Sequence, residues 1–120
     1  MEFTTERWND LLGQFLEELH EQFPSVPEVA SFRATLAAAK IFDEQAPVRK
    51  FVDSLEPHAH LLRERDPAFF ERLGSIGGVN FERLWNSTRD EHTRTVIFDF
   101  LVALFTGGYK ILYDSADPRA

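Results

Sequence analysis

The sequence predicts an all-α fold, a compact single-domain bundle of about five helices packed around a largely buried C-terminal helix. Apolar residues recur at steps of three and four, helix start and stop signals recur along the chain, and no long stretch alternates apolar with polar residues. Residues 93–113 are too apolar for an ordinary surface helix. They are also too interrupted for a membrane span, by Asp99, Gly107, Gly108 and Lys110. We therefore expect the rest of the protein to surround this segment.

The first predicted helix starts at Thr4 or Thr5, runs to about Phe23 and is stopped by Pro24. Gly13 lies on its polar face, where it costs about 1 kcal/mol relative to alanine unless another backbone comes close. The apolar stripe of this helix consists of Trp8, Leu11, Leu12, Phe15, Leu16, Leu19 and Phe23.

A second helix follows at once, because Ser25 and Glu28 form a capping-box pattern and Pro27 falls in the first turn. It ends near residues 42–44. The small side chains of residues 37–39 would let another helix approach closely. The inward side chains are Val29, Phe32, Leu36 and Ala39, with Ile41 near the end.

Pro47 opens a third helix, which breaks at Pro57 and is followed by a short helical turn through Leu61 and Leu62. Its inner stripe consists of Val48, Phe51, Val52 and Leu55.

Asp66 and Pro67 give the start signal of a short fourth helix that buries Phe69, Phe70 and Leu73. Glycines at 74, 77 and 78 then indicate a loop, and residues 80–86 make one or two helical turns.

The last helix begins with the pair Ser87 and Asp90, or the pair Thr88 and Glu91. It runs to about Gly107 or on to Tyr113. The simpler prediction for the two adjacent glycines, Gly107 and Gly108, is that they form a C-cap followed by a short extra turn. The alternative is that they allow a close crossing with another helix.

One narrow polar strip remains on this helix after the apolar residues are assigned to the core. It consists of His92, Thr95, Asp99, Thr106 and Lys110, with Val102 or Ala103 between them. The strip either faces solvent between two neighbouring helices or forms a docking groove for a partner or ligand. Asp99 is expected to have a salt-bridge or Thr95 hydroxyl partner.

Composition and length fit one domain, which we assign to residues 1–113, with a flexible C-terminal tail at 114–120. The 120 residues include 12 Phe and 2 Trp for a core, and no Cys, which excludes disulfides and thiolate metal sites. The first ten residues are acidic and amphipathic, whereas a signal peptide is basic and then apolar. We therefore expect an intracellular protein.

The charge distribution disfavours direct binding to nucleic acid or to anionic membranes. The chain has 20 acidic and 13 basic residues, a formal net charge of −7. The best basic cluster, Arg63, Arg65 and Arg72, is interleaved with Glu64, Asp66 and Glu71.

No residue pattern points to catalysis, to a metal or to another cofactor. His58 and His60 would point about 200° apart on a helix, so a metal site would need a different backbone and a third ligand. Phosphate-loop, dinucleotide, nucleophile-elbow and kinase motifs are missing from the sequence. We therefore expect a non-enzymatic protein.

Four short motifs resemble small uncharacterised all-helical proteins of large double-stranded DNA viruses, including viruses of algae. The motifs are F-P-x-x-P at 23–27, PVRKFVDSLEP at 47–57, RDPAFF at 65–70 and NFERLW at 80–85. The resemblance covers most of the chain, from Phe15 to Leu112. It implies a virion-associated or host-interaction component, located in the virion or in the host cytoplasm, and transfers no catalytic residue.

These observations predict a helical interaction or structural protein whose partner is another protein or a second copy of itself, as a homodimer. The alternative is a helical bundle that binds a hydrophobic small molecule in its Phe-rich core. In that case Phe98, Phe100 and Phe105 would line the cavity.

Overall fold

Helices make up most of the computed structural model, which describes residues 4–76 and 78–114. The first helix, α1 (Thr5–Gln22), starts where predicted, because the Thr4 hydroxyl accepts a hydrogen bond from the backbone N–H of Arg7. Its buried side chains belong to the expected stripe: Trp8, Leu12, Phe15, Leu16 and Leu19. The predicted all-α class and first helix are confirmed.

Helix α2 (Pro27–Phe42) begins without the predicted capping box. The residue that caps it is Val26, whose side chain makes no capping hydrogen bond, and Ser25 lies one position outside. Proline in the first helical turn suffices to start the helix, because its φ angle is already helical and it has no N–H to satisfy. The inward side chains Val29, Phe32 and Leu36 are buried as expected.

The predicted break at Pro57 is present. Helix α3 (Ala46–Leu55) leads into a 3₁₀ turn, η1 (Glu56–His58), which contains the proline and is followed by the short helix α4 (Ala59–Arg63). The tighter turn places proline where no i→i−4 hydrogen bond is required, so the chain changes direction here.

Helix α5 (Ala68–Leu73) follows the start signal at Asp66, whose carboxylate accepts a hydrogen bond from the Ala68 N–H. The predicted loop after it is in fact a minimal hairpin, in which β1 (Ser75–Ile76) pairs antiparallel with β2 (Val79–Asn80). Strands of two residues are too short for an alternating pattern, which explains why the sequence did not indicate them.

Helix α6 (Phe81–Ser87) is separate from α7 (Glu91–Tyr109), so α7 starts later than Ser87 or Thr88. Its cap is Asp90, whose carboxylate accepts hydrogen bonds from the backbone N–H and the hydroxyl of Thr93. A π-helical turn, η2 (Lys110–Asp114), continues α7. Asp114 ends this turn, and the rest of the predicted tail lies outside the described residues.

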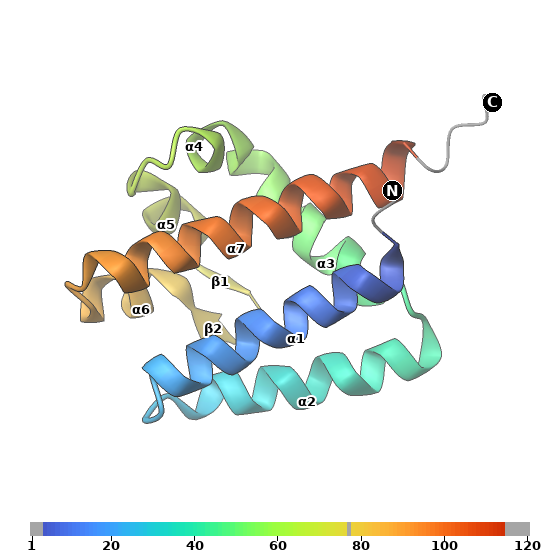
Figure 1. The fold of residues 1–120 in the computed structure, drawn as a ribbon, viewed down its shortest axis with the longest axis horizontal. Coiled ribbons are helices and arrows are strands. Elements are labelled where there is room, and N and C mark those ends of the chain that lie inside the picture. Colours follow the sequence, from blue (N-terminus) through green and yellow to red (C-terminus); the bar gives the residue numbers. More distant parts are fainter. Residues whose placement is uncertain (1–3, 77, 115–120) are drawn as a thin grey trace.

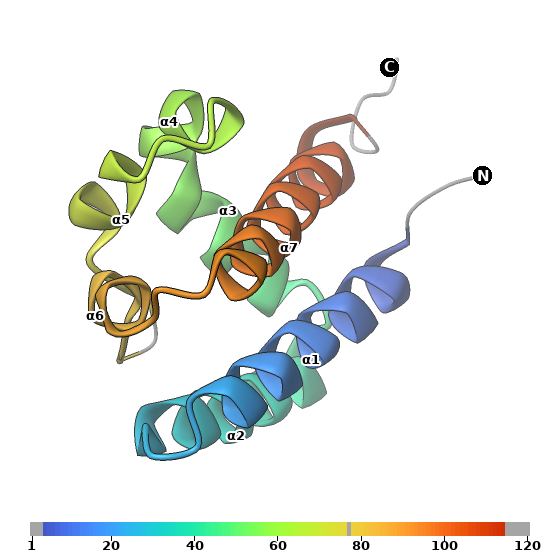
Figure 2. The same cartoon turned by 60° about the vertical axis from the view of Figure 1, so that its left-hand side comes forward.

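The arrangement around α7 matches the predicted architecture. Figure 1 shows α7 running along the length of the molecule with α1 beside it, and Figure 2 shows α1 and α2 as a pair on one side and α3 to α6 as an arc on the other. Helices α1, α3 and α4 all contact α7. The protein measures 46 × 31 × 24 Å.

Gly108 is buried inside α7 instead of capping it, so the simpler of the two glycine predictions is wrong. An added Cβ would lie 2.8 Å from Val52 Cγ2 and 3.0 Å from Trp8 Nε1. The Trp8 indole N–H donates to the Leu104 carbonyl over 2.8 Å, which fixes the ring at this crossing. The glycine therefore permits the close approach of α1 and α3 to α7.

By length and composition, the segment Glu91–Tyr113 is a candidate membrane span, with a mean hydropathy of 1.6 over its best window. Of that window, 44% is buried inside the protein. The core helix of a globular domain has the same composition as a membrane span, so this property does not distinguish the two.

Candidate functional site

The predicted strip on α7 is a continuous exposed edge. His92, Thr95, Asp99, Thr106 and Lys110 are all exposed. Asp99 forms an ion pair with Arg65, which also lies 6.0 Å from the centre of the Phe98 ring. The salt-bridge partner predicted for Asp99 is thus present, and it ties the middle of the strip to the loop after α4.

The C-terminal half of the strip borders a hollow between η1–α4 and α7, which we call the α4–α7 groove. Its volume is about 610 Å³, which lies within the range of about 300 to 1,000 Å³ that is typical of ligand pockets. The lining residues are Glu56, Ala59, His60, Arg63, Phe105, Thr106, Tyr109 and Lys110. Of the five strip residues, Thr106 and Lys110 take part.

An aromatic ladder runs along the end of α7 beside this groove. The Phe105 and Tyr109 rings lie 5.8 Å apart, and the Tyr109 and Tyr113 rings 4.5 Å apart. Tyr109 is 39% exposed and Tyr113 is 47% exposed, whereas Phe105 is buried. Two tyrosine rings are therefore available for contact, on a ladder that is anchored in the core.

The charges at the groove differ from those of the whole chain. Arg63 and Lys110 outnumber Glu56, so the lining is locally positive on a protein with a net charge of −7. The negative charge of Glu56 raises the pKa of the Tyr113 hydroxyl, with smaller contributions from burial and from Asp53. Tyr113 therefore stays a neutral hydrogen-bond donor near pH 7.

The three phenylalanines predicted to line a cavity pack against different neighbours. Phe98 contacts Phe70 on α5, Phe100 stacks on Phe15 on α1 with 5.2 Å between centres, and Phe105 lies next to Tyr109. Phe98 and Phe100 are two positions apart on a helix and so point about 200° apart. Their rings fill separate parts of the core.

His60 lines the α4–α7 groove, while His58 belongs to η1 and is half-buried. Within residues 4–76 and 78–114, no group of three or more His, Cys, Asp or Glu side chains is placed to hold a metal ion.

A second exposed surface was missed by sequence reasoning. Ile41 and Phe42, at the end of α2, are 81% and 90% exposed. The sequence indicated that residues 37–39 were small enough for another helix to approach. It also placed Ile41 with the inward side chains near the end of this helix, and that prediction is wrong. A helical projection of α2 would have placed Ile41 with the alanines opposite Phe32, which was the available signal.

A comparison of this chain with models of protein families, with curated proteins and with solved structures finds no match. The resemblance to viral proteins therefore stays a prediction from its motifs.

Proposed function

We propose that this protein is a non-enzymatic interaction protein that binds an amphipathic helix of a partner protein in the α4–α7 groove. The observation that carries the proposal is the pair of exposed rings, Tyr109 and Tyr113, beside a locally positive hollow of about 610 Å³. Tyrosine and arginine are the residues that most often contribute strongly to binding at protein interfaces.

The chemistry of the groove suggests what the partner helix carries. Phe105 and Tyr109 offer an apolar floor for aliphatic or aromatic anchors at positions i, i+3 or i+4. Arg63 and Lys110 would pair with acidic residues on the flanks of the same helix. Thr106, between them, is small enough to leave the floor accessible.

Surface chemistry elsewhere supports a non-enzymatic role. The pKa values of Asp43 and Asp90 are lowered, and that of Tyr113 is raised. The first two are lowered by structural hydrogen bonds, from Arg49 and from Thr93 respectively, at the ends of helices. Such shifts accompany capping and ion pairing, and they do not require a catalytic function.

The alternative of a hydrophobic ligand within the core has less support, because the Phe98 and Phe100 rings pack against Phe70 and Phe15. A virion-associated or host-interaction role is compatible with the proposal and rests on the sequence resemblance alone.

Photo-crosslinking in the native cells tests the proposal directly. A crosslinking phenylalanine analogue is placed at Thr106, inside the groove, or at Thr95, which is also exposed on the same strip but lies outside the groove. We expect one protein to be crosslinked at Thr106 and absent at Thr95. Identical products at both positions, or none at Thr106, would contradict the proposal.

The identified partner is then titrated with purified protein. Arg63→Glu should weaken binding at least about tenfold, because it places a negative charge opposite acidic residues of the partner. Arg89→Glu changes the net charge equally at an exposed position outside the groove and should leave the affinity within about twofold. Equal losses in the two variants would indicate only long-range electrostatics.

A further inference from the structure

Helix α2 is apolar on the side that faces away from its own core. Around the helix, the exposed residues Pro27, Ala30, Ala34, Ala37, Ala38 and Ile41 all lie within about 60° of Ala34. The buried Val29, Phe32 and Leu36 lie about 140° or more from Ala34. A helix that is apolar on both faces is normally covered on both. One face of α2 is covered by α1, α3 and β2.

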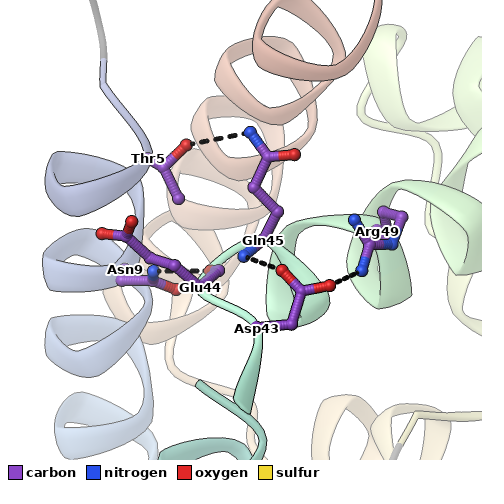
Figure 3. A network of polar contacts seen from close by, with 6 residues as sticks. All are labelled: Thr5, Asn9, Asp43, Glu44, Gln45 and Arg49. Carbon is purple, nitrogen blue, oxygen red and sulfur yellow. Dashed lines mark hydrogen bonds and ion pairs between the residues drawn. The ribbon is translucent and has the colours of Figure 1, made fainter. Parts of the chain in front are cut away.

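The apolar end of this face is held in place by the turn that follows it. Asp43, next to Phe42, accepts a hydrogen bond from the Gln45 backbone N–H and pairs with Arg49 (Figure 3). Asn9 on α1 donates to the Glu44 carbonyl over 3.1 Å. The exposure of Ile41 and Phe42 is thus a fixed feature of the fold, maintained by contacts to both α1 and α3.

A hollow of about 440 Å³ lies at the opposite end of α2. Its apolar walls are Phe23 at the end of α1, Val26 and Pro27 at the start of α2, and Leu84 from α6. Arg83 and Glu28 lie at its polar side. The hollow is large enough for a phenyl ring, which removes about 200 Å² from water when buried.

The exposed Phe42 ring and the hollow lie at equal distances from Ala34 along α2. Phe42 is eight residues after Ala34 and Val26 is eight residues before it, about 12 Å in each direction along the helix. Phe42 and Glu28, which borders the hollow, also lie on the same flank of α2, about 80° and 120° from Ala34.

We infer that two copies of this chain pair through antiparallel α2 helices, with a two-fold axis at Ala34 and with Phe42 of each copy in the hollow of the other. A two-fold axis perpendicular to two antiparallel helices brings matching flanks together, so each Phe42 meets the hollow side of its partner. The alanines let the helices approach closely, and Ile41 falls opposite Pro27. Parallel helices would instead place Phe42 against Phe42 and leave both hollows open.

The contact is small, so the dimer is weak. Helix α2 is about 24 Å long, and one helix pair covers less than the roughly 1,600 Å² of a standard interface. The charged Arg33 lies on the other flank, one residue from the axis, where it faces its own copy across the pair, and this repulsion lowers the affinity further. We expect dissociation in the micromolar range.

Sedimentation equilibrium between about 1 μM and about 1 mM measures this dissociation. Phe42→Ser should raise the dissociation constant roughly thirtyfold, as expected when an interface loses a buried aromatic anchor. Tyr109→Ser, which removes a partly exposed ring from the α4–α7 groove, should leave the dissociation constant unchanged. A wild-type protein that stays monomeric throughout overturns the inference without bearing on partner binding in the groove. A dimer lost only with Tyr109→Ser also overturns the inference, and it would indicate that a second copy binds in the groove.

Single cysteines test the register, since the natural sequence has none. Ala34→Cys should form a disulfide-linked dimer rapidly under mild oxidation, because the two positions meet at the axis. Ile41→Cys alone should form little dimer, whereas a mixture of Ile41→Cys and Pro27→Cys should form the mixed disulfide. Rapid self-linking of Ile41→Cys at the rate of Ala34→Cys would show a parallel pairing and overturn the antiparallel one.

Discussion

Helices α7 and α2 are both apolar around most of their circumference, but they differ in how much of that surface the rest of the chain covers. Buried residues of α7 face α1, α3 and α4, whereas α2 buries only Val29, Phe32 and Leu36. Composition thus indicates that a helix has apolar surface to cover, but only the tertiary arrangement shows whether the same chain covers it. The uncovered face of α2 is consequently the more informative of the two for function.

The two helices also differ in how they start. Helix α7 has a side-chain cap at Asp90, while α2 starts from Val26 with no such hydrogen bond. Gly108 in α7 is closely surrounded by side chains, whereas Gly13, in α1 next to α2, has nothing within 4 Å of where a Cβ would be. Gly108 thus lies at a close helix crossing, whereas Gly13 lies at an open, exposed position.

Leu101→Ala should have the largest effect on stability. Leu101 is fully buried in α7, so the change removes apolar contacts and leaves a cavity, at a cost of about 2 to 5 kcal/mol in the free energy of unfolding. Urea denaturation of the dilute protein measures this value. A loss below about 1 kcal/mol would show that α7 is not the centre of the core.

Substitutions of the two glycines should have opposite signs. Gly108→Ala gains about 1 kcal/mol in helix propensity but forces contact with Val52 and with a Trp8 ring that is fixed by its hydrogen bond. Overpacking costs about 1 to 3 kcal/mol, so we expect a net loss. Gly13→Ala should stabilise by about 0.5 to 1 kcal/mol, because its side chain enters open space. Thermal melts followed by circular dichroism provide the comparison, and stabilisation by both changes would show that the α7 crossing is loose.

Most of the fold could be predicted from the sequence because it follows from local rules. The stripe of α1, the break at Pro57 and the exposed edge of α7 all come from helical period and proline chemistry. The start of α2 could not be predicted, since Ser25 and Glu28 satisfy the capping pattern whether or not the helix begins there. The role of Gly108 depended on which side chains of α1 and α3 cross α7, which is long-range information.

The candidate site divides in the same way. Thr106 and Lys110 could be assigned to an exposed strip from spacing, but the groove also needs Glu56, His60 and Arg63, which are 43 or more positions away along the chain from Thr106. Only the packing of α4 against α7 brings them together.

Substitutions of Asp90, which caps α7, and of Ser25, which was predicted to cap α2, should differ in how their effect on stability depends on pH. The hydrogen bonds from Thr93 hold the pKa of Asp90 below its ordinary value of about 3.9, so the folded state favours the carboxylate. Its contribution to stability is complete above about pH 5 and is lost as the pH falls through the folded-state pKa. Asp90→Ala should therefore destabilise the protein at pH 7 and have little effect near pH 2.

Ser25→Ala should change the free energy of unfolding by less than about 0.5 kcal/mol at either pH, because Ser25 caps nothing. If both variants lost the same free energy of unfolding at pH 7, Ser25 would have the capping role that the sequence predicted.

The smallest effect on folding is expected for Ile41→Ala, at the exposed end of α2. Its side chain is 81% exposed and alanine is the better helix former, so the dilute protein should change by less than about 0.5 kcal/mol, as should Thr106→Ala on the exposed edge of α7. The dependence of the unfolding midpoint on protein concentration distinguishes the two variants, because association stabilises the folded state only when the dimer interface of α2 is intact. The unfolding midpoint of the wild-type protein and of Thr106→Ala should rise with protein concentration, while that of Ile41→Ala should rise less. Ile41 would then be an apolar residue that contributes little to the stability of the monomer and is covered by the second copy. Such a residue distinguishes α2 from α7.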